Sequence, residues 1–429
     1  MGRLWSLKLD CVHILLLSIL CIYYIPRNSD TIKFITRFSQ PKFELNPNIT
    51  RSAPFFMVPS TLLWEIRPYK SWDKLDYTLI TEETPAYNSG VPLCGLMQSI
   101  IYISIYDHAF LSLDPRTQEF IVLQNPPYDK EDNNNRKTNG VYNIGLSFQQ
   151  RYPQFGHLIH DMLCCLSYIP QEVIDQGCVA PGPWSGPHSA IEWISFLKWN
   201  ITLIDGYTHL QVYVNQLWSV NPTFHSHHAT LGGIPNLRRR IRNLYPIDKI
   251  PAKRFVIIKR TGRRSMSNYD ELVTSIKQNV KIDEGMEWEA IPFDSNNLTR
   301  VCFEWATYKV VVTVSGSMCY NSLFMHKNTG FCLSFSKKLD DPNIHLFIAS
   351  EIFMAGVIHL DCDHNADSSF ECNIEKMTRH TQQVVWAVQN GKWGNKAGLR
   401  QYYNLTELKE CPKHKIKPIY IDRFTEYET

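Results

Sequence analysis

Between residues 254 and 336 the hydrophobic positions fall into short dense runs separated by helical patterns. The runs at 254–260, 308–317 and 330–336 predict buried strands, and the stretches at 268–279 and 318–326 predict helices. Short apolar runs with helices between them are typical of βαβ units in a parallel sheet. A last amphipathic stretch at 380–393 predicts a C-terminal helix. The pattern therefore indicates an α/β protein.

The residues before 245 have a less regular pattern. The segment at 232–253 is rich in Gly, Pro and Arg, and it predicts a helix followed by a connection between two bodies. A chain of 429 residues exceeds what one hydrophobic core usually organises. We expect a first body at 56–245, a second at 246–375, and a C-terminal helix and tail at 376–429.

The N-terminal region carries an apolar stretch. Residues 11–25 contain no charge apart from His13, and this length fits either a signal-peptide core or a short membrane anchor. The stretch ends in bulky and aromatic residues, which favours a retained anchor over a cleaved signal. We expect a cytoplasmic tail at 1–10, a transmembrane signal anchor at 11–26 and a polar stem at 27–55.

Sequons and cysteines indicate an oxidising compartment. Glycosylation sequons occur at Asn48, Asn200, Asn297 and Asn404. The cysteines after the apolar stretch are even in number and could form up to five disulfides: Cys94, Cys164, Cys165, Cys178, Cys302, Cys319, Cys332, Cys362, Cys372 and Cys411. No C-x-x-C pair is present, which weakens zinc and redox alternatives. We expect a single-pass type II protein of the Golgi or endoplasmic reticulum membrane, with its body in the lumen.

Charge points to a local rather than a global anion site. The formal net charge is only +3, so the overall charge gives no indication of a nucleic-acid partner, and we expect none. A cluster of cations follows the strand at 254–260, namely Lys259, Arg260, Arg263 and Arg264. Ligands bind at the carboxyl ends of strands in open α/β sheets, and arginines beside a helix N-terminus suit a diphosphate. The alternative is a solvated loop.

A second group of polar residues follows Pro153. On a helix at roughly 100° per residue, His157, His160 and Asp161 share the face opposite the apolar residues. His157 and Asp161 are i,i+4 neighbours, and a His–carboxylate pair is suited to general-base chemistry. The alternative is a solvated polar face. A metal site is less favoured because zinc motifs on helices use i,i+4 histidines.

A third pattern is the turn Ser315-Gly316-Ser317 after the strand at 308–317. Small residues there let a ligand approach the backbone closely, and the following helix offers N–H donors. The turn is not G-x-G-x-x-G, so the dinucleotide fingerprint is absent. The other basic run, at 238–242, predicts an exposed helix face.

Together the three patterns resemble glycosyltransferase family 61, which includes O-mannose β-1,4-N-acetylglucosaminyltransferase, EGF-domain O-GlcNAc transferase and plant β-1,2-xylosyltransferases. The residues that carry the resemblance are His157, His160 and Asp161, then Arg260, Arg264, Asn268, Glu271 and Leu272, then Gly316, Asn321, Leu323 and Phe324. The family usually has His-Gly-Ala where this chain has Ser315-Gly316-Ser317. That difference leaves open an altered donor or a weakly active enzyme.

The resemblance implies a GT-B fold, in which two Rossmann-like domains face a cleft. The first would hold the acceptor and the second the nucleotide-sugar. It also implies inverting transfer of GlcNAc or xylose from a UDP-sugar to a glycan or glycoprotein hydroxyl, with no metal and no cofactor. Asp161 or His157 would be the base, with the other orienting it and His160 beside them. The implied donor-binding residues are Arg260, Arg264, Asn268, Glu271, Ser315, Gly316, Ser317 and Asn321.

Two other interpretations remain open. A metal-dependent GT-A transferase would use Asp361 and Asp363, which have the D-x-D form that binds Mn²⁺ and a diphosphate. Cys362 and Cys372 bracket that motif and suggest a disulfide-bounded loop instead. The second alternative is a lumenal glycoprotein that uses this fold for binding without catalysis.

Overall fold

The computed structural model describes residues 61–66, 76–82, 101–113, 120–122, 138–148, 155–182, 187–204, 211–222, 229–293, 297–336, 341–359, 362 and 369–401. All of them belong to the compact unit Pro54–Thr429. The predicted tail, anchor and stem, at 1–55, lie outside the described residues. Within the described part of the chain, no helix has the length and apolar character needed to cross a membrane.

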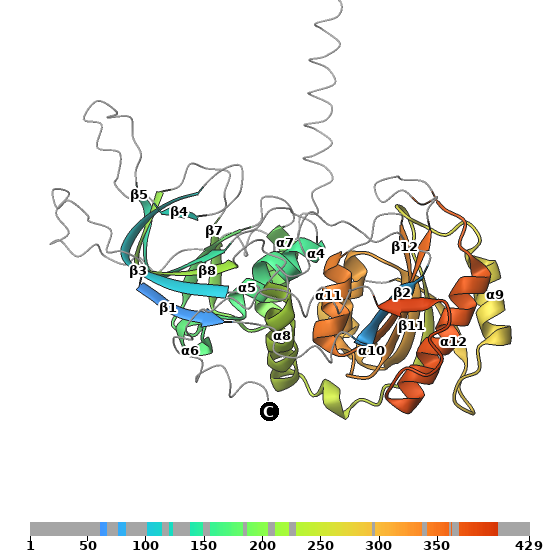
Figure 1. Ribbon diagram of the computed structural model, residues 1–429. Helices are drawn as coiled ribbons and strands as arrows, with labels where there is room; N and C mark the ends of the chain where they lie inside the picture. The colour runs from blue at the N-terminus through green and yellow to red at the C-terminus, as the bar shows by residue number, and fades with distance from the viewer. Residues whose placement is uncertain are drawn as a thin grey trace, which may run out of the picture. The chain divides into compact units, whose positions relative to one another are not determined.

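One sheet is almost entirely parallel (Figure 1). Its strand order is β10-β9-β11-β12-β13-β2-β14, and only β14 pairs antiparallel. The strands are β2 (Thr78–Thr81), β9 (Arg254–Lys259), β10 (Trp288–Pro292), β11 (Tyr308–Val314), β12 (Gly330–Ser336), β13 (Phe353–His359) and β14 (Leu399–Gln401). The three strands predicted from apolar runs are confirmed as β9, β11 and β12, and their pairing is parallel as predicted.

Helices cover both faces of this parallel sheet, which explains why its strands are apolar throughout. Phe255 and Ile257 of β9 pack with α9 (Tyr269–Asn279) and α12 (Ile374–Asn390). Val256 and Ile258, which point the other way, pack with the helices of the opposite face. These are α10 (Leu298–Ala306), α11 (Asp341–Ser350) and the 3₁₀ helix η5 (Ser317–Phe324). The predicted helices at 268–279 and 380–393 are confirmed, whereas that at 318–326 is wound more tightly as η5.

The second sheet is mixed, and the Rossmann-like character of the N-terminal domain stays a prediction. Its order is β1-β3-β8-β5-β6-β7, with β4 paired to β3. Pairing is parallel from β8 to β7 but antiparallel among β1, β3, β4 and β8. The strands are β1 (Thr61–Ile66), β3 (Ile101–Leu113), β4 (Phe120–Val122), β5 (Thr138–Phe148), β6 (Cys178–Pro181), β7 (Ile201–Ile204) and β8 (Gln211–Pro222).

The mixed sheet is followed in sequence by α8 (Thr230–Leu244) and the short 3₁₀ helix η4 (Ile247–Lys249), as predicted for 232–253. The parallel sheet, however, takes β2 from the region expected in the first body and β14 from the expected C-terminal tail. The predicted domain limits at 245 and 375 therefore stay predictions, because the parallel sheet combines strands from before residue 245 and from after residue 375 with the strands between them.

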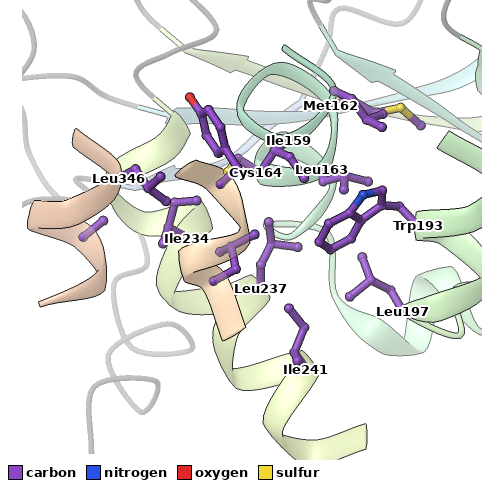
Figure 2. Packing of buried hydrophobic residues seen from close by; sticks show 14 of the residues in the cluster. Ile159, Met162, Leu163, Cys164, Trp193, Leu197, Ile234, Leu237, Ile241 and Leu346 are labelled. Carbon is purple, nitrogen blue, oxygen red and sulfur yellow. The ribbon is translucent and has the colours of Figure 1, made fainter. Parts of the chain in front are cut away.

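A buried helical segment connects β5 to β6. It comprises α4 (Phe155–His157), the π-helix η2 (Leu158–Leu163) and α5 (Cys164–Leu166), and it is followed by α6 (Gln171–Ile174) and α7 (Pro187–Phe196). Figure 2 shows the apolar packing of this segment, which contributes Ile159, Met162, Leu163 and Cys164. They pack with apolar side chains from elsewhere in the chain, namely Trp193, Leu197, Ile234, Leu237, Ile241 and Leu346. Packing of this kind, rather than helix propensity, stabilises so short a segment.

The helical segment crosses α8 at Gly233 with almost no space between the backbones. A Cβ on Gly233 would lie 2.8 Å from Cys164 Cα and 2.9 Å from its carbonyl oxygen. Neither atom belongs to a flexible side-chain end, so the two helices would have to separate.

Buried thiols reduce the number of possible disulfides. Cys164, Cys165, Cys178, Cys302 and Cys332 are buried and form no disulfide. The sequence-based expectation of up to five disulfides is therefore too high. Burial raises the pKa of Cys178 to about 12, so this thiol stays protonated and unreactive.

We predict that Gly233→Ala lowers the free energy of unfolding by about 1–3 kcal/mol, because the added methyl group overpacks the crossing. Urea denaturation measures the effect. Asn243→Ala, at an exposed position of the same helix, is the control and should change stability by less than about 0.5 kcal/mol. Equal stability of the two variants would contradict the prediction.

Candidate active site

A buried carboxylate holds two imidazoles. The Asp161 side chain is 0% exposed, and its two oxygens contact different histidines. His157 Nδ1 is 2.8 Å from Oδ2, and His160 Nδ1 is 2.6 Å from Oδ1. An ionised carboxylate only accepts hydrogen bonds, so both Nδ1 atoms donate to it and the proton acceptor of each ring is Nε2.

The three polar residues are not on a solvated face, so the solvated-face alternative does not hold. His160 is 3% exposed and Asp161 0%, while the His157 side chain keeps 21% of its surface. The backbone here is a π-helix, whose i→i+5 bonding widens the turn. Such π-helical turns are common at functional sites. Burying an ionised carboxylate costs free energy unless its oxygens are hydrogen-bonded, as those of Asp161 are here.

Burial lowers the pKa of His160 below its ordinary value of 6.5, and the neighbouring carboxylate of Asp161 opposes that effect. The ligand atoms of His157, His160 and Asp161 lie within 4.8 Å of one another. That spacing could hold a metal ion, although Nδ1 of each histidine is already hydrogen-bonded to Asp161.

The second group forms at the ends of β9 and β11. These neighbours lie where the order β10-β9-β11-β12-β13 reverses direction, which is the position where open α/β sheets bind ligands. Arg260 donates from Nη1 to the Ser315 carbonyl at 3.1 Å and from Nε to the Arg263 carbonyl at 2.6 Å. Arg264 has a left-handed backbone, with φ of 58°, which is uncommon for a residue with a side chain.

Both guanidinium groups converge on Gly316. A Cβ on Gly316 would overlap Arg260 Nη1 and would lie 3.1 Å from Arg264 Nη2. The φ of Gly316 is 149°, a value that also favours glycine. The structure therefore brings together the arginine motif and the Ser-Gly-Ser turn that the sequence analysis identified separately.

The His–Asp group and this turn are neighbours. A Cβ on Gly156, one residue before His157, would lie 3.3 Å from Ser317 Oγ and 3.2 Å from the Tyr320 ring. The rings of His160 and Tyr320 are 5.7 Å apart. All three sequence motifs are thus contiguous in space.

The remaining residues of the predicted donor site differ in exposure. Ser315 is buried, and its N–H donates to the Ser334 carbonyl at 2.8 Å. Its hydroxyl has no hydrogen-bond partner among the residues that the structure describes. Asn321 is buried within η5 at 3% exposure. Glu271 is exposed in the first turn of α9.

Asn268 pairs with a distant backbone. It precedes α9 as predicted, but its side chain makes no cap hydrogen bond. Its Nδ2 donates to the Cys372 carbonyl at 2.9 Å, and its Oδ1 accepts from the Cys372 N–H at 2.8 Å. The contacts of Asn268 thus connect the arginine loop to the chain at 372.

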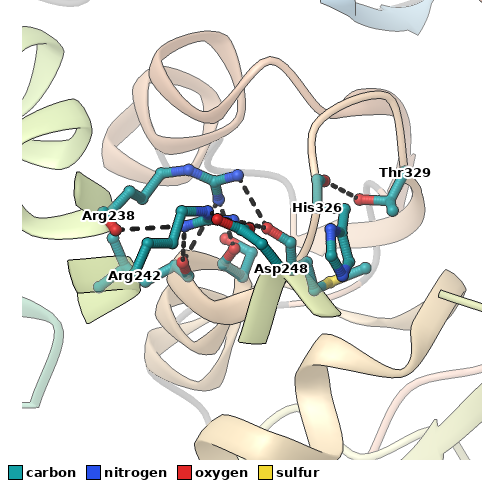
Figure 3. A network of polar contacts seen from close by, with 8 residues as sticks. Arg238, Arg242, Asp248, His326 and Thr329 are labelled. Carbon is teal, nitrogen blue, oxygen red and sulfur yellow. Dashed lines mark hydrogen bonds and ion pairs between the residues drawn. The ribbon is translucent and has the colours of Figure 1, made fainter. Parts of the chain in front are cut away.

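The basic run at 238–242 is not an exposed helix face, so that expectation is wrong. Arg238 is 5% exposed and donates to backbone carbonyls of η5 and of Met325 (Figure 3). Arg242 also reaches Met325 and pairs with Asp248. Sequence composition could not reveal this, because the acceptors lie some eighty residues away.

Other predicted sites are only partly described. Asn200 and Asn297 are exposed, as glycosylation requires, whereas Asn48 and Asn404 lie outside the described residues. Asp361 and Asp363 also lie outside them, so the D-x-D alternative has no geometry to compare.

One comparison with known proteins identifies the region that carries these groups. A family model described as Glycosyltransferase 61 matches residues 155–332. The match begins at the helical segment with the His–Asp group and ends within β12. A search among curated proteins gives no match.

We predict that acid destabilises the protein through His160. Its folded pKa lies below 6.5, so the unfolded chain binds the proton first. The contribution is complete above pH 6.5 and falls below that pH by at most about 1.4 kcal/mol per pH unit. Urea denaturation at several pH values should show a smaller slope for His160→Asn, which keeps a donor for Asp161. Equal slopes below pH 6.5 would contradict this, and equal slopes above pH 7 are the internal control.

Proposed function

We propose that this chain, whose residues 155–332 match the glycosyltransferase family 61 model, is a glycosyltransferase that transfers a sugar from a UDP-sugar to a hydroxyl group with inversion. The donor sugar is GlcNAc or xylose, and the acceptor is a glycan or glycoprotein of the secretory pathway. Neither a metal ion nor a cofactor takes part. The family match makes an enzyme the better interpretation than a non-catalytic binding protein.

One observation carries the proposal: two arginines converge on a glycine turn directly beside a His–carboxylate group. Gly316 contacts the guanidinium groups of Arg260 and Arg264, and Ser317 adjoins Gly156. A sugar diphosphate transferase needs positive charge for the leaving diphosphate and a base near the acceptor oxygen. These two requirements are met by adjacent elements.

The base is His157, and Asp161 orients it. His157 is the member of the group with an exposed surface, and its Nδ1 donates to Asp161. Its Nε2 takes the proton of the acceptor hydroxyl while the acceptor oxygen forms its bond to the anomeric carbon. Asp161, buried between the two rings, stabilises the imidazolium that results, and His160 fixes the second carboxylate oxygen.

The leaving group is stabilised by the arginines. As the bond between the anomeric carbon and the diphosphate oxygen breaks, negative charge grows on the diphosphate. Arg260, Arg264 and the N–H groups that begin η5 neutralise it. Arginine makes paired, directional hydrogen bonds to phosphate oxygens and is always charged, so it supplies what a divalent cation would otherwise provide.

The remaining parts of the proposal concern location. The apolar residues 11–26 are a type II signal anchor in the Golgi or endoplasmic reticulum membrane, and the domain is lumenal. The exposed sequons at Asn200 and Asn297 support a lumenal location because they are accessible to the glycosylation machinery.

We predict that the purified full chain, incubated with UDP-sugars and acceptor glycans, releases UDP at the same rate with and without EDTA. His157→Ala and Asp161→Asn should each lower kcat by about 10²–10⁴-fold, because general-base catalysis contributes that much. Release abolished by EDTA would contradict the metal-independent mechanism and would require a metal ion, either at the cluster of His157, His160 and Asp161 or at the D-x-D motif of Asp361 and Asp363. Activity that survives both substitutions would exclude them as the base and its partner.

Donor affinity gives a separate prediction. Arg264→Ala should weaken UDP binding, measured by calorimetry, by about 10–100-fold, because a charge-assisted pair with phosphate is lost. Arg263→Ala is the matched control, since Arg263 is an exposed neighbour whose backbone carbonyl accepts from Arg260 Nε, a contact that the substitution keeps. Equal affinity of the two variants would remove Arg264 from the donor site.

A further inference from the structure

Two arginines of α8 hold the end of η5. Arg238 donates from Nη1 to the Ser322 carbonyl at 2.9 Å and from Nη2 to the Met325 carbonyl at 2.8 Å. Arg242 donates from Nη2 to the same Met325 carbonyl at 2.8 Å. Figure 3 shows both guanidinium groups pointing at this turn of backbone.

The Met325 carbonyl, just after the end of η5, accepts from both arginines, and the Ser322 carbonyl accepts from Arg238 in addition to the Met325 N–H. The last carbonyls of a helix lack N–H donors within the helix, and nearby cations stabilise them. Arg238 is almost completely buried, and burying a guanidinium is costly unless its donors are used. Its planar fork reaches carbonyls at two different positions at once, which a lysine ammonium cannot reproduce.

The other end of η5 lies at the proposed donor site. The helix begins at Ser317, directly after the glycine that both donor-site arginines contact. It is only eight residues long. Because η5 is short and buried, we expect a shift of its end at Met325 to be transmitted to its start through the close-packed interior.

The helix α8 contacts the His–Asp segment as well. At Gly233 its backbone lies against Cys164, three residues after Asp161. The same α8 thus contacts the end of η5 through its arginines and the His–Asp segment through its glycine. The start of η5 meets that segment again where Ser317 adjoins Gly156.

We propose that Arg238 is a positioning residue that fixes the donor-binding turn relative to the His–Asp group, with Arg242 in support. The role in transfer rests on the proposed function, whereas the mechanical link does not. Among the described residues, Arg238 makes no hydrogen bond to the turn or to the histidines; it acts on them through η5 and α8. Arg242 is fixed in turn by Asp248, whose carboxylate accepts from Nε at 2.9 Å.

The test compares Arg238→Lys with Arg240→Lys by hydrogen exchange of the full chain. Arg240 is the matched control because it lies on the same helix but donates to the carbonyls of Leu197 and Lys198, away from η5. We expect Arg238→Lys to speed exchange at least tenfold in both 317–325 and 155–166, with strands β9, β11 and β12 unchanged. Arg240→Lys should leave both segments as in the wild type.

Uniform faster exchange throughout the chain, or no change at 155–166, would overturn the proposal, since either result means a role in stability alone. Arg242→Lys is the second variant if Arg238→Lys does not fold, and it should give the same pattern at smaller size. In turnover assays, Arg238→Lys should lower kcat at least tenfold while the acceptor KM changes less than threefold.

Binding of UDP separates the two proposals. If the wild type binds no UDP while Arg238→Lys loosens both segments, the proposed donor is wrong and the positioning link stands. If the wild type binds and turns over a UDP-sugar but Arg238→Lys exchanges and reacts like Arg240→Lys, the positioning role falls and the enzyme assignment stands.

Discussion

The close contact between the Arg260 guanidinium and the backbone of Gly316 is the constraint on which the site depends. Any side chain at this position would occupy the place of Arg260 Nη1 and crowd Arg264. Arg260 also donates to the carbonyl of Ser315, the residue before Gly316, so the cation is held against the turn from which η5 starts. The two strands that end here, β9 and β11, are neighbours at the point where the strand order of the parallel sheet reverses. Sheet topology, a glycine and two cations together create the site that we propose for a diphosphate.

Buried polar groups fix the remaining elements around the site, and each of these groups is stable only when all its hydrogen-bonding atoms are paired. Asp161 has both carboxylate oxygens occupied by imidazole donors. Arg238 has its donors on carbonyls at the end of a short helix. Removing one partner in either group leaves a buried charge or carbonyl unsatisfied, which costs more than the pair itself contributes. Such groups therefore specify one arrangement of the helices around the site.

The sequence predicted what local pattern controls. Apolar runs and their spacing were sufficient for β9, β11 and β12, for α9 and α12, and for parallel pairing. It did not predict burial of His160 and Asp161, because their surroundings come from α8 and η5 and because a π-turn breaks the 3.6-residue period. Asn268 has the composition of a helix cap, yet its partner is the backbone of Cys372. A basic run usually faces solvent, and only tertiary contacts bury Arg238. Each miss concerns a polar group whose partner is distant in sequence.

The short strand β2 has a consequence for how the chain is made. It pairs with β13 through Met354 and Thr78, so the parallel sheet is completed by a segment synthesised long before the rest of it. At translation rates of roughly 5–20 residues per second, β2 exists for roughly 15–55 seconds before its partner emerges. During that time its backbone N–H and C=O groups have no native strand to pair with, and such edges are prone to mispairing. Chaperone occupancy during biosynthesis should therefore concentrate on this early strand, and a fragment that starts after it would expose β13 as an open edge.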